Sequence, residues 1–298
     1  MKIRVGYGLG TRSVTNDFES YSLLVDTLEA LRFDSLWLSE KITDECPDPV
    51  VAMAFAAART KKLKFGTSVL VLPGRNPMLL AKELATLDQL SNGRLLPAFG
   101  LGQVDPAEQQ AFGVERSERA GRFDEMLGLL RRFWSEDSVD HEGEFFTYEA
   151  ARVRPRPVQD PIEIWFGGRA PSELRRIGRT GDGWLPSFCT PDDVRTGRAE
   201  IERVAAENGR AIDPEHFGAL VPYGIDGVPD VVGAVLAKRR PDVDPADVVA
   251  GSLAELKAHL ERFVEVGASK FVVVPFVEPE RWDDHLAEVA DVVMPLQN

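Results

Sequence analysis

The sequence has few of the residues that most often carry metal-dependent or hydrolytic chemistry. Its 298 residues include two cysteines, Cys46 and Cys189, and four histidines. Two isolated cysteines form neither a disulfide framework nor a CxxC metal motif, and the histidines do not have the spacing of metal ligands. We therefore expect no disulfide scaffold and no metal site, and a reducing, cytoplasmic location.

Long apolar runs and an excess of positive charge are also lacking. No apolar stretch approaches the length of a bilayer span, and the first ten residues are too short for a signal-peptide core, so we expect neither a membrane anchor nor a leader. The net charge of −13 argues against nucleic acid or an anionic membrane surface as a partner. A small-molecule substrate is compatible with this charge, because one Arg or Lys can hold an anion locally.

The sequence does contain a repeated alternation of short apolar strands and longer amphipathic helices. Strands are expected near 3–8, 35–39, 63–71, 95–100, 162–167, 183–188, 216–224 and 270–275. Such alternation implies parallel pairing through right-handed crossovers. It predicts an α/β fold, a single (β/α)8 or TIM barrel domain over residues 1–298, rather than an open sheet. Residues 135–160 fall outside the pattern and are expected to be an insertion with a short hairpin between units four and five.

In such a barrel, the carboxyl ends of the strands carry the chemistry. We call this edge the rim. The predicted rim is rich in glycine and apolar residues, whereas His141, His216, His259 and His285 all fall outside it. A Ser–His–Asp or Cys–His arrangement is therefore disfavoured, and with it hydrolase chemistry.

Two glycine-containing segments at strand ends allow the main chain to approach a ligand closely. They are "GLGQ" at 100–103 and "FGGRA" at 166–170. The second runs into the N-terminus of a helix, which favours anions, and Arg169 adds a positive charge. We expect Gly167, Gly168, Arg169 and Ala170 to hold a phosphate group.

The strand at 63–72 contains an unexpected hydroxyl pair, Thr67 and Ser68, in an otherwise apolar run. Small polar residues weaken a core strand. Either the core is tight at this point or a ligand lies against the backbone, and the residues alone leave both readings open.

Several segments together resemble the luciferase-like monooxygenase superfamily of flavin- and deazaflavin-dependent barrels. They span nearly the whole chain in order: "FDSLWLSE" (33–40), "FGTSVLVLPGRNPMLLAKELATLDQLSNGRL" (65–95), "GLGQ" with "AFGV" (111–114), "RVRPRPVQDPIEIWFGG" (152–168), "RTGDGWLPS" (179–187) and "GASKFVVVP" (267–275). The resemblance implies a tricyclic cofactor across the strand ends, and members are often homodimers, which is one option for this chain.

Within that superfamily, "TSVL" at 67–70 matches the branch that uses the deazaflavin coenzyme F420. In that branch this strand carries a non-prolyl cis peptide behind the ring, which here would be the Ser68–Val69 bond. The resemblance thus implies an F420-dependent oxidoreductase that performs two-electron hydride transfer on an unidentified small organic substrate. The implied cofactor-binding residues are Glu40, Ser68, Val69, Leu70, Val71, Gly100, Leu101, Gly102, Gly167, Gly168, Arg169 and Ala170.

The sequence departs from the superfamily at two candidate catalytic positions. Lys41 stands where members commonly have a histidine, and Gln103 stands where the sugar-phosphate dehydrogenase branch has a glutamate. Neither replacement performs the same proton transfer, so we expect an electrostatic role for Lys41, with a simple ion pair to Glu40 as the alternative. Two other functions remain open: an FMN-dependent monooxygenase that uses reduced flavin and oxygen, and a non-catalytic flavin-binding relative.

Overall fold

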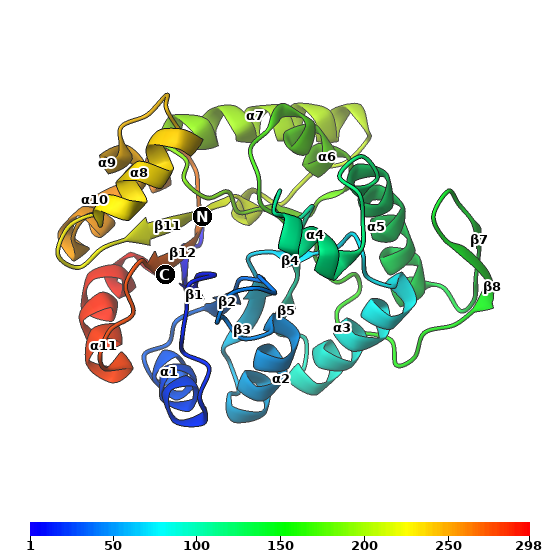
Figure 1. Cartoon of the computed structure of the whole chain (residues 1–298), viewed down its shortest axis with the longest axis horizontal. Coiled ribbons are helices and arrows are strands. Elements are labelled where there is room, and N and C mark those ends of the chain that lie inside the picture. The colour runs from blue at the N-terminus through cyan, green and yellow to red at the C-terminus, as the bar shows by residue number, and fades with distance from the viewer.

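Parallel strands close into a barrel, and helices form a ring around it (Figure 1). The computed structural model describes residues 1–298, except for the side chains of residues 231 and 239. Around the barrel the strands are β1 (Arg4–Leu9), β2 (Ser35–Leu38), β3 (Lys64–Thr67) continued by β4 (Leu70–Val71), β5 (Leu95–Leu96) continued by β6 (Ala98–Gly100), β9 (Trp165–Phe166), β10 (Gly183–Trp184), β11 (Gly218–Tyr223) and β12 (Lys270–Pro275). Parallel bridges from Trp184 to Phe217 and from Ser187 to Leu220 join β10 to β11 and complete the circle. The predicted TIM barrel is confirmed.

Several helices begin with both a side-chain cap and a proline. Asp48, Asn76 and Asp105 each accept hydrogen bonds from backbone amides of the first helical turn, and a proline follows each of them. The helices are α1 (Phe18–Ala30), α2 (Pro49–Arg59), α3 (Pro77–Ser91), α4 (Pro106–Phe112), α5 (Arg119–Ser135), α6 (Pro171–Thr180), α7 (Pro191–Glu207), α8 (Asp230–Arg239), α9 (Pro245–Val248), α10 (Leu253–Glu265) and α11 (Trp282–Val293). In the described part of the chain, none of them is long and apolar enough to cross a membrane.

An antiparallel hairpin lies between α5 and β9, where the sequence predicted one. It pairs β7 (Val139–Glu142) with β8 (Thr147–Ala151) and projects from the ring of helices (Figure 1). The carboxylate of Glu125, on α5, accepts hydrogen bonds from the backbone amides of Phe145 and Phe146 at 3.0 Å each. These contacts fasten the hairpin turn to the barrel's outer layer.

Several strands are shorter than predicted, for identifiable reasons. Pro97 and Pro186 have no N–H to donate to a ladder, so the fourth strand divides into β5 and β6, and β10 ends early. The amide of Ile164 donates to the side chain of Asp182 instead of a neighbouring strand, which delays β9. His216 lies in a short 3-10 turn, Pro214–His216, capped by Asp213.

Two tryptophans fill the middle of the barrel. The rings of Trp37 and Trp165 are fully buried, with centroids 6.2 Å apart. Glycines opposite them provide the space: a Cβ atom on Gly66 would lie 2.4 Å from Trp37 Cε3, and one on Gly183 would lie 2.4 Å from Trp165 Cδ2. We call Trp37 and Trp165 the tryptophan layer.

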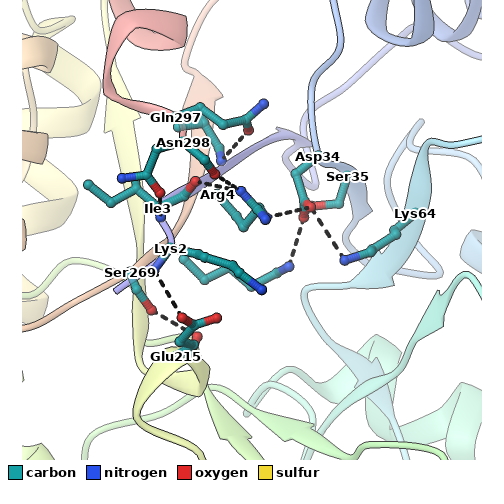
Figure 2. A network of polar contacts seen from close by, with 12 residues as sticks. Lys2, Ile3, Arg4, Asp34, Ser35, Lys64, Glu215, Ser269, Gln297 and Asn298 are labelled. Atoms are coloured by element: carbon teal, nitrogen blue, oxygen red, sulfur yellow. Dashed lines mark hydrogen bonds and ion pairs between the residues drawn. The ribbon is translucent and has the colours of Figure 1, made fainter.

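A charged network lies at the end of the barrel away from the rim, where the strands begin; its contacts are drawn in Figure 2. Asp34 pairs with Lys270 at 2.8 Å, with Lys64 at 3.4 Å and with Arg4 at 3.8 Å. The ammonium of Lys270 lies 5.6 Å from the centroid of the Trp165 ring, so the tryptophan layer adjoins this network. The network joins β1, β3 and β12 through the residue that precedes β2.

Candidate active site

A cavity of about 370 Å³ opens at the rim. Most of its lining comes from the loops after β1, β2, β10 and β12 and from the inner face of α8. Its lining residues are Leu9, Gly10, Thr11, Arg12, Ser13, Ser39, Lys41, Asp44, Ser68, Gln103, Ser187, Phe188, Leu220, Pro222, Val232, Val235, Leu236, Val274, Pro275, Phe276 and Glu278. The predicted site residues Lys41, Ser68 and Gln103 are therefore brought together in the wall of one cavity.

Lys41 contributes a fixed positive charge to this wall. Its ammonium lies 2.8 Å from the carboxylate of Asp44, and this hydrogen bond raises the pKa of Lys41 above the ordinary value for lysine. The loop itself is anchored by Glu108, whose carboxylate accepts hydrogen bonds from the amide of Thr43 at 3.1 Å and from its hydroxyl at 2.9 Å. The alternative in which Lys41 pairs with Glu40 is wrong, because Asp44 is the partner.

Glu40 supports the neighbouring strand instead. Its side chain is 1% exposed, and it accepts a hydrogen bond from the backbone amide of Val71 at 2.7 Å while pairing with the guanidinium of Arg75. Burial raises the pKa of the Glu40 carboxyl, and Arg75 and the Val71 amide offset part of that effect. The carboxylate thus fixes the end of β2 to β4.

The Ser68–Val69 peptide bond is cis, which confirms the prediction made for it. The hydroxyl of Ser39 lies 3.2 Å from both the carbonyl and the hydroxyl of Ser68. Thr67 has a different use: its hydroxyl donates to the carbonyl of Ala98 at 2.6 Å and accepts from the Ala98 amide at 2.8 Å. One hydroxyl of the pair therefore joins two strands, and the other lies on the cavity wall.

The predicted glycines leave room for the side chains of β4 and of the residue before it. A Cβ atom on Gly100 would lie 2.4 Å from Val69 Cγ2, and one on Gly167 would lie 3.4 Å from Val69 Cγ1. Gly102 has a φ of +82°, and its Cβ would lie 3.0 Å from a methyl group of Val71. Since β4, β6 and β9 are hydrogen-bonded neighbours, these residues form one continuous surface at the rim.

The segment before α6 lies at the far end of this surface. Gly168, Arg169 and Ala170 are exposed, Gly168 has a φ of +75°, and α6 begins at Pro171 without a side-chain cap from Ala170. Its position after β9 places it beyond the lining of the 370 Å³ cavity. The structure therefore separates the predicted residues into a cavity group and a neighbouring glycine–valine surface, which we define as residues 69, 100–102 and 167–170. Leu70 and Val71 are 0% and 6% exposed, so their side chains lie in the core beneath this surface and not on it.

Sequence reasoning assigned no role to several residues that line the cavity. Phe188 and Phe276 stack with ring centroids 6.3 Å apart and form an apolar wall with α8. Glu278, three residues after the end of β12, adds a carboxylate to the lining. The sequence signal that could have identified Glu278 is its position just after a predicted strand end at the rim. Among the described residues, no group of three or more His, Cys, Asp or Glu side chains is arranged to hold a metal ion.

Comparison with known proteins decides the family. The sequence profile described as luciferase-like monooxygenase matches residues 3–240. The chain belongs to the luciferase-like monooxygenase family.

Two relatives show how far this similarity extends. An uncharacterised protein of Mycobacterium tuberculosis strain H37Rv is 32% identical over 203 residues, which cover 67% of this chain and 66% of that protein, so the match spans slightly less than two thirds of the relative. The F420-dependent glucose-6-phosphate dehydrogenase of Amycolatopsis mediterranei strain U-32 is 30% identical over 312 aligned positions, covering 91% of this chain and 92% of the relative.

Solved structures share the luciferase-like barrel. A monooxygenase of Streptomyces bottropensis superimposes with a TM-score of 0.81 at 22% identity, covering 99% of both chains. The oxygenating component of a type II Baeyer–Villiger monooxygenase of Pseudomonas putida, in complex with FMN, gives a TM-score of 0.74 at 17% identity and covers 98% of this chain and 97% of the other. The family and its named members support an oxidoreductase that works with a flavin or a deazaflavin.

Proposed function

We propose that this chain is an F420-dependent oxidoreductase that moves a hydride to or from a small organic substrate. The observation that supports this most is the glycine–valine surface, which adjoins a cavity whose wall carries the charged Lys41. The relative from Amycolatopsis mediterranei, named as F420-dependent, matches almost the full chain and points to the deazaflavin rather than FMN. We also propose that residues 1–298 act as one domain, because β1 pairs with β12.

The residues present fit a phosphate-bearing tricyclic cofactor. Val69, Gly100, Leu101 and Gly102 are partly exposed and offer backbone and apolar side chains, which suit the flat face of a ring. Leu70 and Val71 are buried and support this surface from below. Gly167 to Ala170 precede an uncapped helix N-terminus, where free amides and the Arg169 guanidinium suit a phosphate. Glu40 acts indirectly in this proposal, by fixing β4 through Val71 and Arg75. The bound deazaflavin would supply the two-electron chemistry.

Lys41 and Gln103 are the proposed catalytic residues in the cavity. Because its pKa is raised, Lys41 stays protonated and can stabilise negative charge that develops on a substrate oxygen or on the reduced ring. Gln103 can donate and accept hydrogen bonds but cannot transfer a proton. The chain's own contribution is therefore orientation and electrostatic stabilisation rather than acid–base catalysis by these two groups.

Cofactor titration tests the proposal. We expect F420 to bind at least tenfold more tightly than FMN, and Arg169→Glu to weaken F420 binding at least tenfold because it replaces attraction with repulsion. Arg175→Glu is the matched control, because Arg175 is exposed on α6, the helix that follows Arg169. It should change F420 affinity less than twofold. Tight FMN binding with oxygen-dependent turnover would refute the proposal and support an FMN-dependent monooxygenase instead. Binding without any redox turnover would support the non-catalytic relative.

A further inference from the structure

We infer that Glu278 is a substrate-recognition group, a carboxylate that accepts a hydrogen bond from a hydroxyl or ammonium group on an otherwise apolar substrate. The inference rests on the proposed function, since it names the substrate class for the same cavity. Glu278 follows β12, and its side chain is partly buried on the cavity wall.

The carboxylate of Glu278 is held in place by two hydroxyl groups from the far end of the sequence. The hydroxyl of Thr15 donates to Oε2 at 2.9 Å, and the hydroxyl of Ser13 donates to Oε1. Both hydroxyl residues are buried, at 3% and 4% exposure. Trp282 Nε1 donates to Thr15 Oγ1 at 3.1 Å, so the proton of the Thr15 hydroxyl is directed towards Glu278. These contacts build a rigid carboxylate site from the loops after β1 and β12.

Hydroxyl donors fix a carboxylate without neutralising it. A carboxylate offers about four lone-pair positions, and Ser13 and Thr15 use two of them. The other lone-pair positions of the carboxylate can accept a hydrogen bond from a ligand, because Glu278 lines the cavity. Two cations line the same cavity: Lys41 is paired with Asp44 at 2.8 Å, and among the described side chains Arg12 forms no ion pair with Glu278. A ligand group that donates a hydrogen bond therefore meets a positioned acceptor at Glu278.

The apolar part of the lining favours an apolar substrate body. Phe188 and Phe276 stack there, and Val232, Val235 and Leu236 of α8 continue the apolar surface. An apolar carbon skeleton gains by covering this wall, at about 25 cal/mol per Å² of apolar surface removed from water. The cavity thus fits a molecule with an apolar body and a donor group that reaches Glu278. An anionic group placed at Glu278 would be repelled.

Four ring compounds of equal skeleton test the inference by calorimetry on the F420-loaded protein: cyclohexanol, cyclohexylamine, cyclohexanone and cyclohexanecarboxylate. We expect at least one donor compound, the alcohol or the ammonium, to bind at least fivefold more tightly than the ketone and the carboxylate. The relative affinity of alcohol and ammonium then identifies which donor the site prefers. Glu278→Gln should reduce the donor preference below twofold, and Glu278→Asp, which keeps the charge but shortens the reach, should lose at least half of it.

Glu280→Gln is the matched control, because Glu280 is exposed, lies two residues away and loses the same charge. It should keep the donor preference within twofold. A preference for the carboxylate in the parent protein, or a donor preference unchanged in both Glu278 variants, would overturn the inference. F420 titration of the same variants is measured separately: loss of the donor preference with normal F420 affinity assigns the effect to Glu278, whereas absence of F420 binding in the parent protein refutes the proposed function instead.

Discussion

The electrostatic role proposed for Lys41 can be measured by removing its ammonium group. We expect Lys41→Met to lower kcat/KM at least tenfold, equivalent to about 1.4 kcal/mol of transition-state stabilisation, because the charge is lost from the cavity wall. Since the hydrogen bond that Lys41 donates to Asp44 raises the pKa of Lys41, the parent protein should show no titration of this group between about pH 6 and 9. The same change at the exposed Lys62 is the control. A loss smaller than threefold would remove Lys41 from the mechanism.

Arg75 has a structural role that depends on pH. Its removal in Arg75→Met leaves the Glu40 carboxylate buried without its cation, which should cost about 3 kcal/mol of unfolding free energy at pH 8. Burial already raises the pKa of Glu40, and loss of Arg75 raises it further, so the carboxyl is protonated and the penalty shrinks as the pH falls. Urea unfolding at pH 5 and pH 8 measures the difference.

The control for that experiment is Arg203→Met. Arg203 is an exposed residue whose ion pairs with Glu200 and Glu207 lie on the surface of α7, where solvent screens them, so its loss should leave the urea midpoint close to that of the parent at both pH values. An equal penalty for the Arg75 variant at both pH values would contradict the assignment of Glu40 as the pH-sensitive partner.

At the scale of elements, the fit between β4 and β6 can be tested at one glycine. Gly100→Ala places a methyl group 2.4 Å from Val69 Cγ2, so Val69 must shift. We expect a loss of about 1–3 kcal/mol of stability, as for other overpacked sites, and at least fivefold weaker cofactor binding. Val69→Ala in the same chain should restore part of both. Gly128→Ala in α5, where no described atom lies within 4 Å of the new methyl, should instead gain about 0.5–1 kcal/mol.

How much of these elements the sequence predicts depends on the physical signal behind each. The order of strands and helices follows from apolar periodicity. The hairpin was predicted because residues 135–160 interrupt the alternation of strands and helices. Strand ends were less predictable: the partner chosen by the Ile164 amide, a side chain of Asp182, cannot be read from a linear pattern. The seven-residue helix α4 was missed, since it is too short to show a clear period.

The candidate site divides in the same way. Lys41, Ser68 and Gln103 were predicted as site residues from the resemblance to the superfamily, and all three line one cavity. Glu278 was missed because its significance arises only when the loops after β1 and β12 come together, bringing Ser13 and Thr15 to its carboxylate across 263 or more positions. Pairings of that kind are set by barrel closure, not by local sequence.

For the whole molecule, closure of the barrel is expected to depend on Asp34. Burial alone would raise the pKa of its carboxyl, but Lys270 and Lys64 outweigh burial and leave the pKa below its ordinary value. The stabilisation by Asp34 is therefore present above the pKa of the unfolded chain and is lost as the pH falls through the lower folded value. Asp34→Asn should cost about 3 kcal/mol at pH 7, because Lys270 is left buried without its partner, and the difference from the parent should diminish towards pH 3.

Asp137→Asn is the comparison for that experiment, because the Asp137 side chain is 85% exposed in its pairs with Arg154 and Arg156. Because solvent screens these pairs, the Asp137→Asn variant should unfold close to the parent midpoint at every pH. Denaturant unfolding across pH 3 to 7 gives both curves. A constant penalty for Asp34→Asn over this range would show that its carboxylate does not contribute through its charge.

The tryptophan layer has a consequence for how such a protein can change over evolutionary time. It lies between the rim loops, which carry Glu278 and Lys41, and the charged network around Asp34. Groups that are far apart and share no partners contribute additively, usually to within about 0.5 kcal/mol. Stability held at one end can therefore be retained while loops at the other are exchanged. A descendant of this chain could acquire a new substrate by altering the rim alone and inherit the rest of the barrel unmodified.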